Sequence, residues 1–338
     1  MTCKRQSSDS RYLLRVLVLG WLILVVLGAA RADSEVTVQE FTTTLVVRSG
    51  QDSDGRPTQE WLRAIGVFHD DQSLRQIAQT PTPFSYKELQ WAKMIERRAA
   101  YWPGQIEALG DPFSGISVRR VVVIVLGNIG GNDAFIAEGK NIAFDLSDLL
   151  SLYGAAELVS SVERIDRFFA HEFTHLLHRE WRRVHQPAIQ SPLERALWVC
   201  LAEGLGNYRS LSARWTDPDG RLSQHAKDVL SRLQPILVER LSLLEEASDD
   251  EAGPLLKGLS MGPFEEKWGA LSVALWLTQE AKGDDNALRK WVDAGPWGIL
   301  DLASKYLPYD LAARLPENQN NKAYELDLTS SDSHDLPE

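Results

Sequence analysis

The chain has 338 residues, of which 44% are hydrophobic and 25% are charged, a balance that predicts a globular protein with a sizeable core and excludes general disorder. Its formal net charge is −11, and so acidic a surface argues against nucleic acid or anionic lipid as a partner. The composition names no positive partner.

Residues 1–32 have the three-part layout of a secretory signal peptide. Basic residues precede the apolar run from Val16 to Leu27, and Ala30-Arg31-Ala32 then supplies small residues at the expected cleavage site. The alternative is an uncleaved membrane anchor, although the apolar run is short for a full span. We therefore expect an exported protein, periplasmic or secreted if the source is bacterial, with a membrane contact only if the segment stays attached.

Cys200 is the only cysteine that remains once residues 1–32 are removed, because Cys3 lies in the signal segment. No intrachain disulfide is then expected, so the core must supply the stability. Cys200 lies inside the apolar stretch from Leu197 to Leu201, which favours a buried structural thiol over a nucleophile.

The first part of the chain predicts a small sheet and a helix. Val36 to Val47 predicts one strand or two short ones, and Val118 to Leu126 is a nearly unbroken run of Val, Ile and Leu that predicts a buried strand. Asn141 to Leu146 predicts a further strand. Between them, the capping box Ser85-Tyr86-Lys87-Glu88 opens a helix to about Tyr101, which Pro103 and Gly104 end.

From Ser160 onward, the pattern is helical. Ser160 and Glu163 predict a capping box for a helix that ends near Val184, and Ser191-Pro192-Leu193-Glu194 opens a second helix to about Tyr208. Two further helical patterns cover residues 221–246, interrupted at Pro235, and residues 263–282.

These elements predict an α+β fold, with a small N-terminal sheet packed on a mainly helical part. We expect one domain over residues 33–316, in which a mixed α/β part at 33–155 precedes a helical part at 156–316 that carries the functional site. Residues 317–338 are polar and predict a disordered tail.

The strongest functional pattern is His171-Glu172-Phe173-Thr174-His175, inside a predicted helix. At about 3.6 residues per turn, His171 and His175 lie roughly 40° apart around the axis and roughly 6 Å apart along it, so both imidazoles can reach one metal ion. Glu172 is turned away from both and can flank the ion as a general base. The alternative is a helix that carries two ordinary histidines. We predict a single zinc ion, which neutral imidazoles, one carboxylate and one water suit.

A carboxylate that can complete this ligand set is Glu203, 28 residues after His175. Gly204 and Gly206 follow it, and each costs a helix interior about 1 kcal/mol relative to Ala. Close approach of two helices around a metal explains such glycines, whereas the alternative is an ordinary helix-end carboxylate before a glycine cap. We predict that Glu203 is the third ligand.

Three neighbouring residues have weaker patterns. Asn207 lies one turn beyond Glu203, where it either orients a ligating imidazole or is a simple helix-end Asn. Tyr208 is expected to pack rather than to stabilise an oxyanion. His178 lies about 10 Å along the axis from His171, too far to share the ion, so we expect it either to face solvent or to support the metal ligands without binding the ion.

These residues resemble those of the gluzincin metallopeptidases, in particular the compact bacterial enzymes with a His-Glu-x-x-His motif and a later Glu-Gly. The resemblance covers about residues 118–210 and implies a zincin-like fold, with His171, His175 and Glu203 as zinc ligands and Glu172 as the catalytic acid and base. It also implies that the sheet offers an edge strand to an extended substrate, for which we expect Asn141 to Leu146. The downstream tyrosine or histidine that assists the oxyanion in relatives has no counterpart that we can place.

The sequence therefore predicts a zinc-dependent hydrolase of peptide bonds, acting on a peptide or protein substrate through a metal-activated water with Glu172 as general base and acid. One alternative is a peptidase-like zinc module that binds extended peptides without cleaving them. Retention of Glu172 argues against it, because a pure binding site has no need of a base. The other alternative is a metallohydrolase that acts on a different amide or ester.

Overall fold

The computed structural model describes residues 45–317, apart from 67, 81, 117, 119, 128–132 and 218. The predicted signal segment at 1–32 and the predicted tail beyond residue 317 lie outside the described residues. Within the described part of the chain, no helix is long and apolar enough to span a membrane.

The sheet has four strands in the order β1-β2-β4-β3. Its strands are β1 (Leu45–Ser49), β2 (Val121–Leu126), β3 (Ala134–Ala137) and β4 (Asn141–Asp145). β1, β2 and β4 are parallel, and β3 is antiparallel to β4. β2 and β4 are buried along their whole length, as the continuous apolar run of β2 predicts for a parallel strand covered on both faces.

The predicted edge strand was wrong. Asn141 to Leu146 contains β4, which is paired on both sides, and the edge next to it is β3. A single turn, in which Glu138 and Gly139 have positive φ, reverses the chain between β3 and β4. β3 has only four residues, and all four are apolar, so the sequence has no alternation of apolar and polar residues that would predict the strand.

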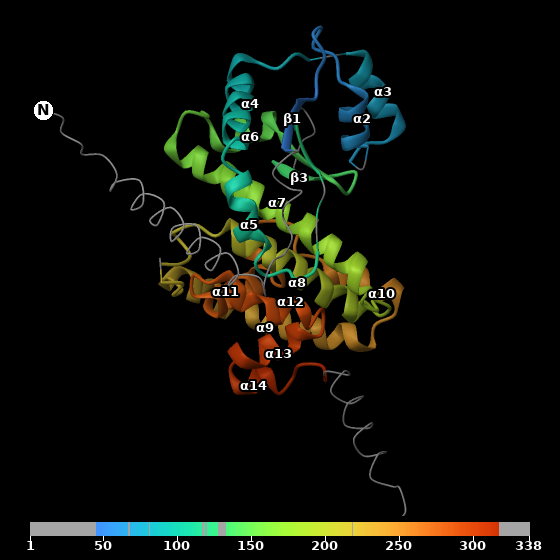
Figure 1. Cartoon of the computed structure of the whole chain (residues 1–338). Coiled ribbons are helices and arrows are strands. Elements are labelled where there is room, and N and C mark those ends of the chain that lie inside the picture. Colours follow the sequence, from blue (N-terminus) through green and yellow to red (C-terminus); the bar gives the residue numbers. More distant parts are fainter. Residues whose placement is uncertain are drawn as a thin grey trace, which may run out of the picture.

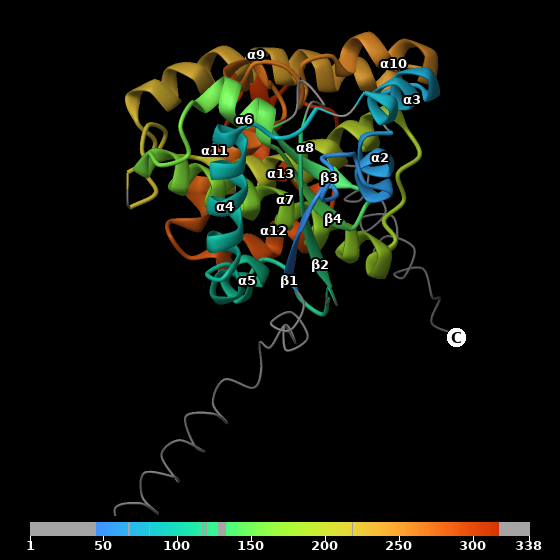
Figure 2. The same ribbon diagram turned by 90° about the horizontal axis from the view of Figure 1, so that it is seen from above.

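Each face of the sheet packs against different helices, because successive side chains of a strand point to opposite faces. Val122, Ile124 and Leu126 of β2 pack with Trp61 and other apolar side chains of α2 (Gln59–Ile65). The alternate β2 residues join the main core, together with α4 (Tyr86–Ala99) and the long helix α7 (Val159–His185). Figures 1 and 2 show α2 and α3 (Asp71–Gln79) on one side of the sheet and α4 on the other.

The helical part forms a second layer beneath the sheet in Figure 1, with α7 between the two. α8 (Pro192–Ser210) packs against both α7 and α11 (Ala270–Ala281). The other elements are α5 (Pro103–Gly110), α6 (Leu146–Tyr153), α9 (Gln224–Glu246), α10 (Asp249–Leu256), η2 (Phe264–Glu266), η3 (Asp285–Leu288), α12 (Arg289–Asp293), α13 (Gly298–Tyr306) and α14 (Tyr309–Ala312). The predicted α+β fold with a small N-terminal sheet and a mainly helical remainder is confirmed.

Local signals set some helix ends and not others. The capping boxes at Ser85 and Ser191 are both present. The capping box predicted at Ser160 is wrong: α7 begins at Val159 without a side-chain cap. α9 runs through Pro235 without interruption, and its apolar face on either side of the proline is buried, so packing outweighs the lost backbone hydrogen bond.

Candidate metal centre

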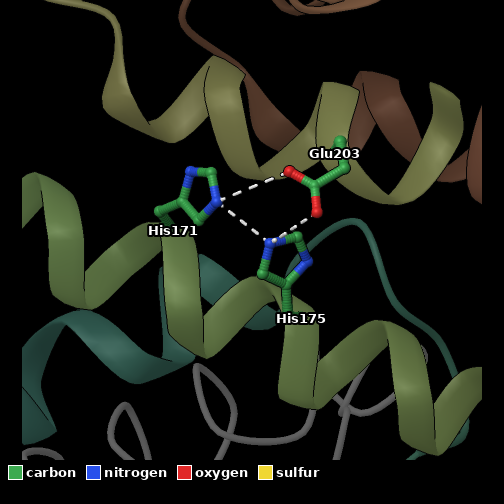
Figure 3. A group of neighbouring side chains, drawn as sticks. All are labelled: His171, His175 and Glu203. Carbon is green, nitrogen blue, oxygen red and sulfur yellow. Dashed lines mark hydrogen bonds and ion pairs between the residues drawn. The ribbon is translucent and has the colours of Figure 1, made fainter. Parts of the chain in front are cut away.

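Helices α7 and α8 bring three predicted ligands together. His171 and His175 point from α7 toward Glu203 on α8 (Figure 3). The two Nε2 atoms are 2.9 Å apart, and the Glu203 carboxylate oxygens lie 3.6 Å from Nε2 of His175 and 3.9 Å from Nε2 of His171. Donors on a tetrahedral zinc ion lie about 3.4 Å apart, since each is about 2.0–2.1 Å from the metal. The observed separations bracket this value, so the three side chains fit one metal ion.

Both imidazoles have the protonation state that a metal ligand needs. Burial lowers the pKa of His171 well below its ordinary value, and the neighbouring His175 and Lys267 lower it further. Burial also lowers the pKa of His175, despite the opposing effect of Glu203. Both rings are therefore neutral at neutral pH, with a lone pair available.

Ser210 fixes the orientation of one imidazole. Its Oγ lies 3.0 Å from Nδ1 of His171, which leaves Nε2 directed toward Glu203. Sequence analysis missed this residue. A signal existed, because Ser210 follows Glu203 by seven residues, about two turns, and so lies on the same face of α8.

Glu172 lies beside the three donors without belonging to them. Its residue exposure is 7%, and its Oε1 is 4.0 Å from Nε2 of His171. Burial raises the pKa of this carboxyl well above its ordinary value, and the charges of Glu203 and Asp133 add to the effect. A carboxyl with a raised pKa holds a proton more readily than an ordinary one, which is a property that acid–base chemistry uses.

The two glycines after Glu203 serve different contacts. A Cβ atom at Gly206 would lie 3.0 Å from Nε2 of His171 and 3.1 Å from Cε1 of His175. A Cβ atom at Gly204 would lie 2.8 Å from Cβ of Val273 on α11. Only Gly206 thus makes room for the imidazoles, whereas Gly204 allows α8 and α11 to approach.

Two expectations about neighbouring polar residues were only partly met. Asn207 is 1% exposed, and its Nδ2 has no hydrogen-bond partner among the described residues, so Ser210 rather than Asn207 orients His171. The expectation that His178 faces solvent was wrong, because it is also 1% exposed. Its ring stacks on Trp198 at 4.3 Å between centroids, and burial lowers its pKa to about 3.

Tyr208 and Cys200 lie where the sequence predicts them. The Tyr208 hydroxyl donates to Asp285 at 2.5 Å, and Tyr208 does not line the cavity that holds the triad. Cys200 is fully buried, and burial raises its thiol pKa to about 12, which leaves it protonated.

The triad lies in a cavity of about 910 Å³. Its lining follows α7 from Arg164 to Arg182, with His171 and His175 in the middle, and it includes Glu203 and residues of β3 on its walls. At about 1.5 Å per residue, this part of α7 is roughly 27 Å long, enough for about eight residues of extended peptide.

β3 runs beside α7 along this cavity. Before the strand, Asp133 accepts a hydrogen bond from Tyr153, whose ring lies under the guanidinium of Arg164 at 3.9 Å. After the strand, Gly139 lies against the guanidinium of Arg179. β3 therefore points in the same direction as α7, from Arg164 toward Arg179.

Comparison with known proteins gives no match: no family model, no curated protein and no solved structure shows significant similarity to this chain. The chemistry of the site must therefore be inferred from its own residues.

Proposed function

We propose that the chain is a zinc-dependent hydrolase of peptide bonds. The observation that carries this proposal is the position of a buried, easily protonated carboxyl, Glu172, beside a group of two neutral imidazoles and one carboxylate. His171, His175 and Glu203 would hold the ion. When bound, zinc supplies a Lewis acid that polarises a carbonyl and lowers the pKa of a water.

Glu172 would move the proton during hydrolysis. It would accept a proton from the attacking water and deliver it to the amine that leaves. Its raised pKa supports this role, because the carboxyl can hold the proton between the two steps. Helix geometry keeps Glu172 out of the ligand set. Adjacent residues of an α-helix are turned about 100° from each other, so the side chain of Glu172 cannot point in the same direction as that of His171.

The edge strand supports an extended peptide as substrate. β3 pairs with β4 on one side, and no strand covers its other side among the described residues. Ala134, Phe135 and Ile136 line the cavity. A peptide can add to such an edge through main-chain hydrogen bonds, which is one of the common modes of peptide recognition.

The position of the triad supports internal rather than terminal cleavage. The cavity continues along α7 for about two turns beyond each histidine, so a chain can extend in both directions from the metal site. An exopeptidase would instead close one end of its cleft and capture the terminal charge there.

The proposal is tested by zinc content and peptide cleavage of the wild-type chain, Glu172→Gln and Glu203→Ala. We expect one zinc per wild-type chain, retained metal with loss of activity in Glu172→Gln, and loss of both in Glu203→Ala. Glu180→Gln is the matched control, because Glu180 lies on α7 but pairs with Arg183 outside the cavity.

The alternatives have distinct outcomes in the same experiment. A wild-type chain that holds zinc and binds peptides without cleaving them would be a binding module. Hydrolysis of esters or other amides, with no peptide cleavage, would show a different metallohydrolase. A chain that takes up no zinc would contradict all three.

A further inference from the structure

The cavity is cationic although the protein is acidic. Five basic side chains line it, against three carboxylates, whereas the whole chain has 36 basic and 47 acidic residues. Of the three carboxylates, Glu203 belongs to the triad, Glu172 lies beside it with Oε1 4.0 Å from Nε2 of His171, and Asp133 accepts a hydrogen bond from Tyr153. The five basic residues are Arg164, Arg167, Arg179, Arg182 and Lys267.

Carboxylates of the described residues do not neutralise most of these five cations. Arg164, Arg179, Arg182 and Lys267 form no ion pair with the carboxylates of the described residues, and Arg167 has only a long contact of 3.9 Å to an exposed Glu163. Outside the cavity, arginines such as Arg98 and Arg209 are paired.

The excess of positive charge is greatest at the end of the cavity beyond His175. Arg182 lies over the ring of Trp198 at 5.0 Å, and Arg179 lies against the backbone at Gly139, so both guanidinium groups are held by contacts that leave their charge uncompensated. Asp133 lies at the opposite end, near Arg164, and Glu138, in the turn after β3, contacts Lys140 instead.

We propose that this end of the cavity selects peptides with an acidic side chain on the amino-terminal side of the cleaved bond. The proposal rests on the peptidase function proposed above. A peptide that pairs antiparallel with β3 has its amino-terminal half at the Arg179 end, because β3 itself runs toward that end. Arg179 and Arg182 follow His175 by four and seven residues, roughly 6 and 10 Å along α7, which corresponds to the second or third peptide residue from the cleaved bond.

The test compares two peptides that differ only in Glu or Gln at the second and third residues before the cleaved bond. We expect kcat/KM to be about 10-fold higher for the Glu peptide, the effect of a charge-assisted hydrogen bond in a cleft, and the ratio to fall with added salt. In Arg179→Gln/Arg182→Gln the ratio of the two kcat/KM values should approach 1. Arg183→Gln is the matched control, because Arg183 is exposed on the same helix and pairs with Glu180.

A binding measurement keeps the selectivity separate from catalysis. In zinc-loaded Glu172→Gln, the fluorescence anisotropy of labelled peptides should give a Kd about 10-fold lower for the Glu peptide than for the Gln peptide. Equal affinities, or equal kcat/KM in the wild-type chain, would overturn the proposed selectivity while leaving the peptidase function intact. Selective binding of the Glu peptide, with no cleavage of either peptide by the wild-type chain, would contradict the peptidase function and leave the selectivity intact. A sulfated oligosaccharide that binds as tightly as the Glu peptide would also overturn the assignment, because the site would then be a general anion site.

Discussion

Gly206 on α8 faces His171 on α7 so closely that a Cβ atom at this position would lie 3.0 Å from Nε2, the atom directed at Glu203. Gly206→Ala should therefore displace the imidazole and lower zinc affinity by about 10- to 100-fold, the range seen when the support of a metal ligand is removed. Competition with a chelator measures this affinity. Thermal stability should hold, because Ala favours the helix by up to about 1 kcal/mol relative to Gly.

Gly204→Ala should lower thermal stability rather than zinc affinity. The added methyl meets Val273 on α11, and such overpacking costs typically about 1–3 kcal/mol. We expect a lower Tm with little change in zinc affinity. The double variant Gly204→Ala/Val273→Ala restores the space, so it should recover part of the lost stability. A fall in zinc affinity as large as that of Gly206→Ala would contradict the separate roles of the two glycines.

Ser210→Ala removes the hydrogen bond to Nδ1 of His171 and frees the ring to rotate. Loss of such a contact weakens metal binding by about 10- to 100-fold. Asn207→Ala provides the comparison, because Asn207 lies on the same helix but forms no hydrogen bond with either imidazole. If Asn207→Ala weakened zinc binding more than Ser210→Ala, the assignment of the supporting residue would be reversed.

Glu280 on α11 should make stability depend on pH in the acid range. Its side chain is 4% exposed, and hydrogen bonds from Lys290, Lys305, Tyr306 and Trp291 outweigh the opposing effect of burial and lower its pKa to about 2. Because this pKa lies below the ordinary value of 4.5, the ionised group stabilises the fold above pH 4.5, and the contribution is lost as the pH falls toward 2.

Glu280→Gln tests this contribution by urea unfolding across the same pH range. Loss of hydrogen bonds to a charged group costs about 1.5–3 kcal/mol at neutral pH, and the difference in unfolding free energy from wild type should shrink in acid. Glu266→Gln, an exposed residue of η2, should leave both the stability and its pH dependence unchanged. An equal slope of stability against pH in wild type and Glu280→Gln would show that other groups dominate acid unfolding.

Features that depend on local spacing can be predicted from the sequence. A helical repeat places His171 and His175 on one face and Glu172 on another, and the capping box at Ser191 sets the start of the helix that carries Glu203. The buried run of β2 and the buried thiol of Cys200 follow from apolar stretches in the same way. Each of these features depends on residues that lie close to one another in the sequence.

Contacts between distant segments could not be predicted from the sequence. Three features join segments that are distant in sequence. They are the pairing of β3 as the edge strand, the contact of Ser210 with His171, and the burial of His178 between aromatic rings. The gathering of cations along the cavity is also tertiary. A helical repeat shows that Arg179 and Arg182 lie near His175, but it does not show which face of α7 the strand β3 covers. Helix packing and strand order set these contacts, and neither is encoded in the spacing of a single segment.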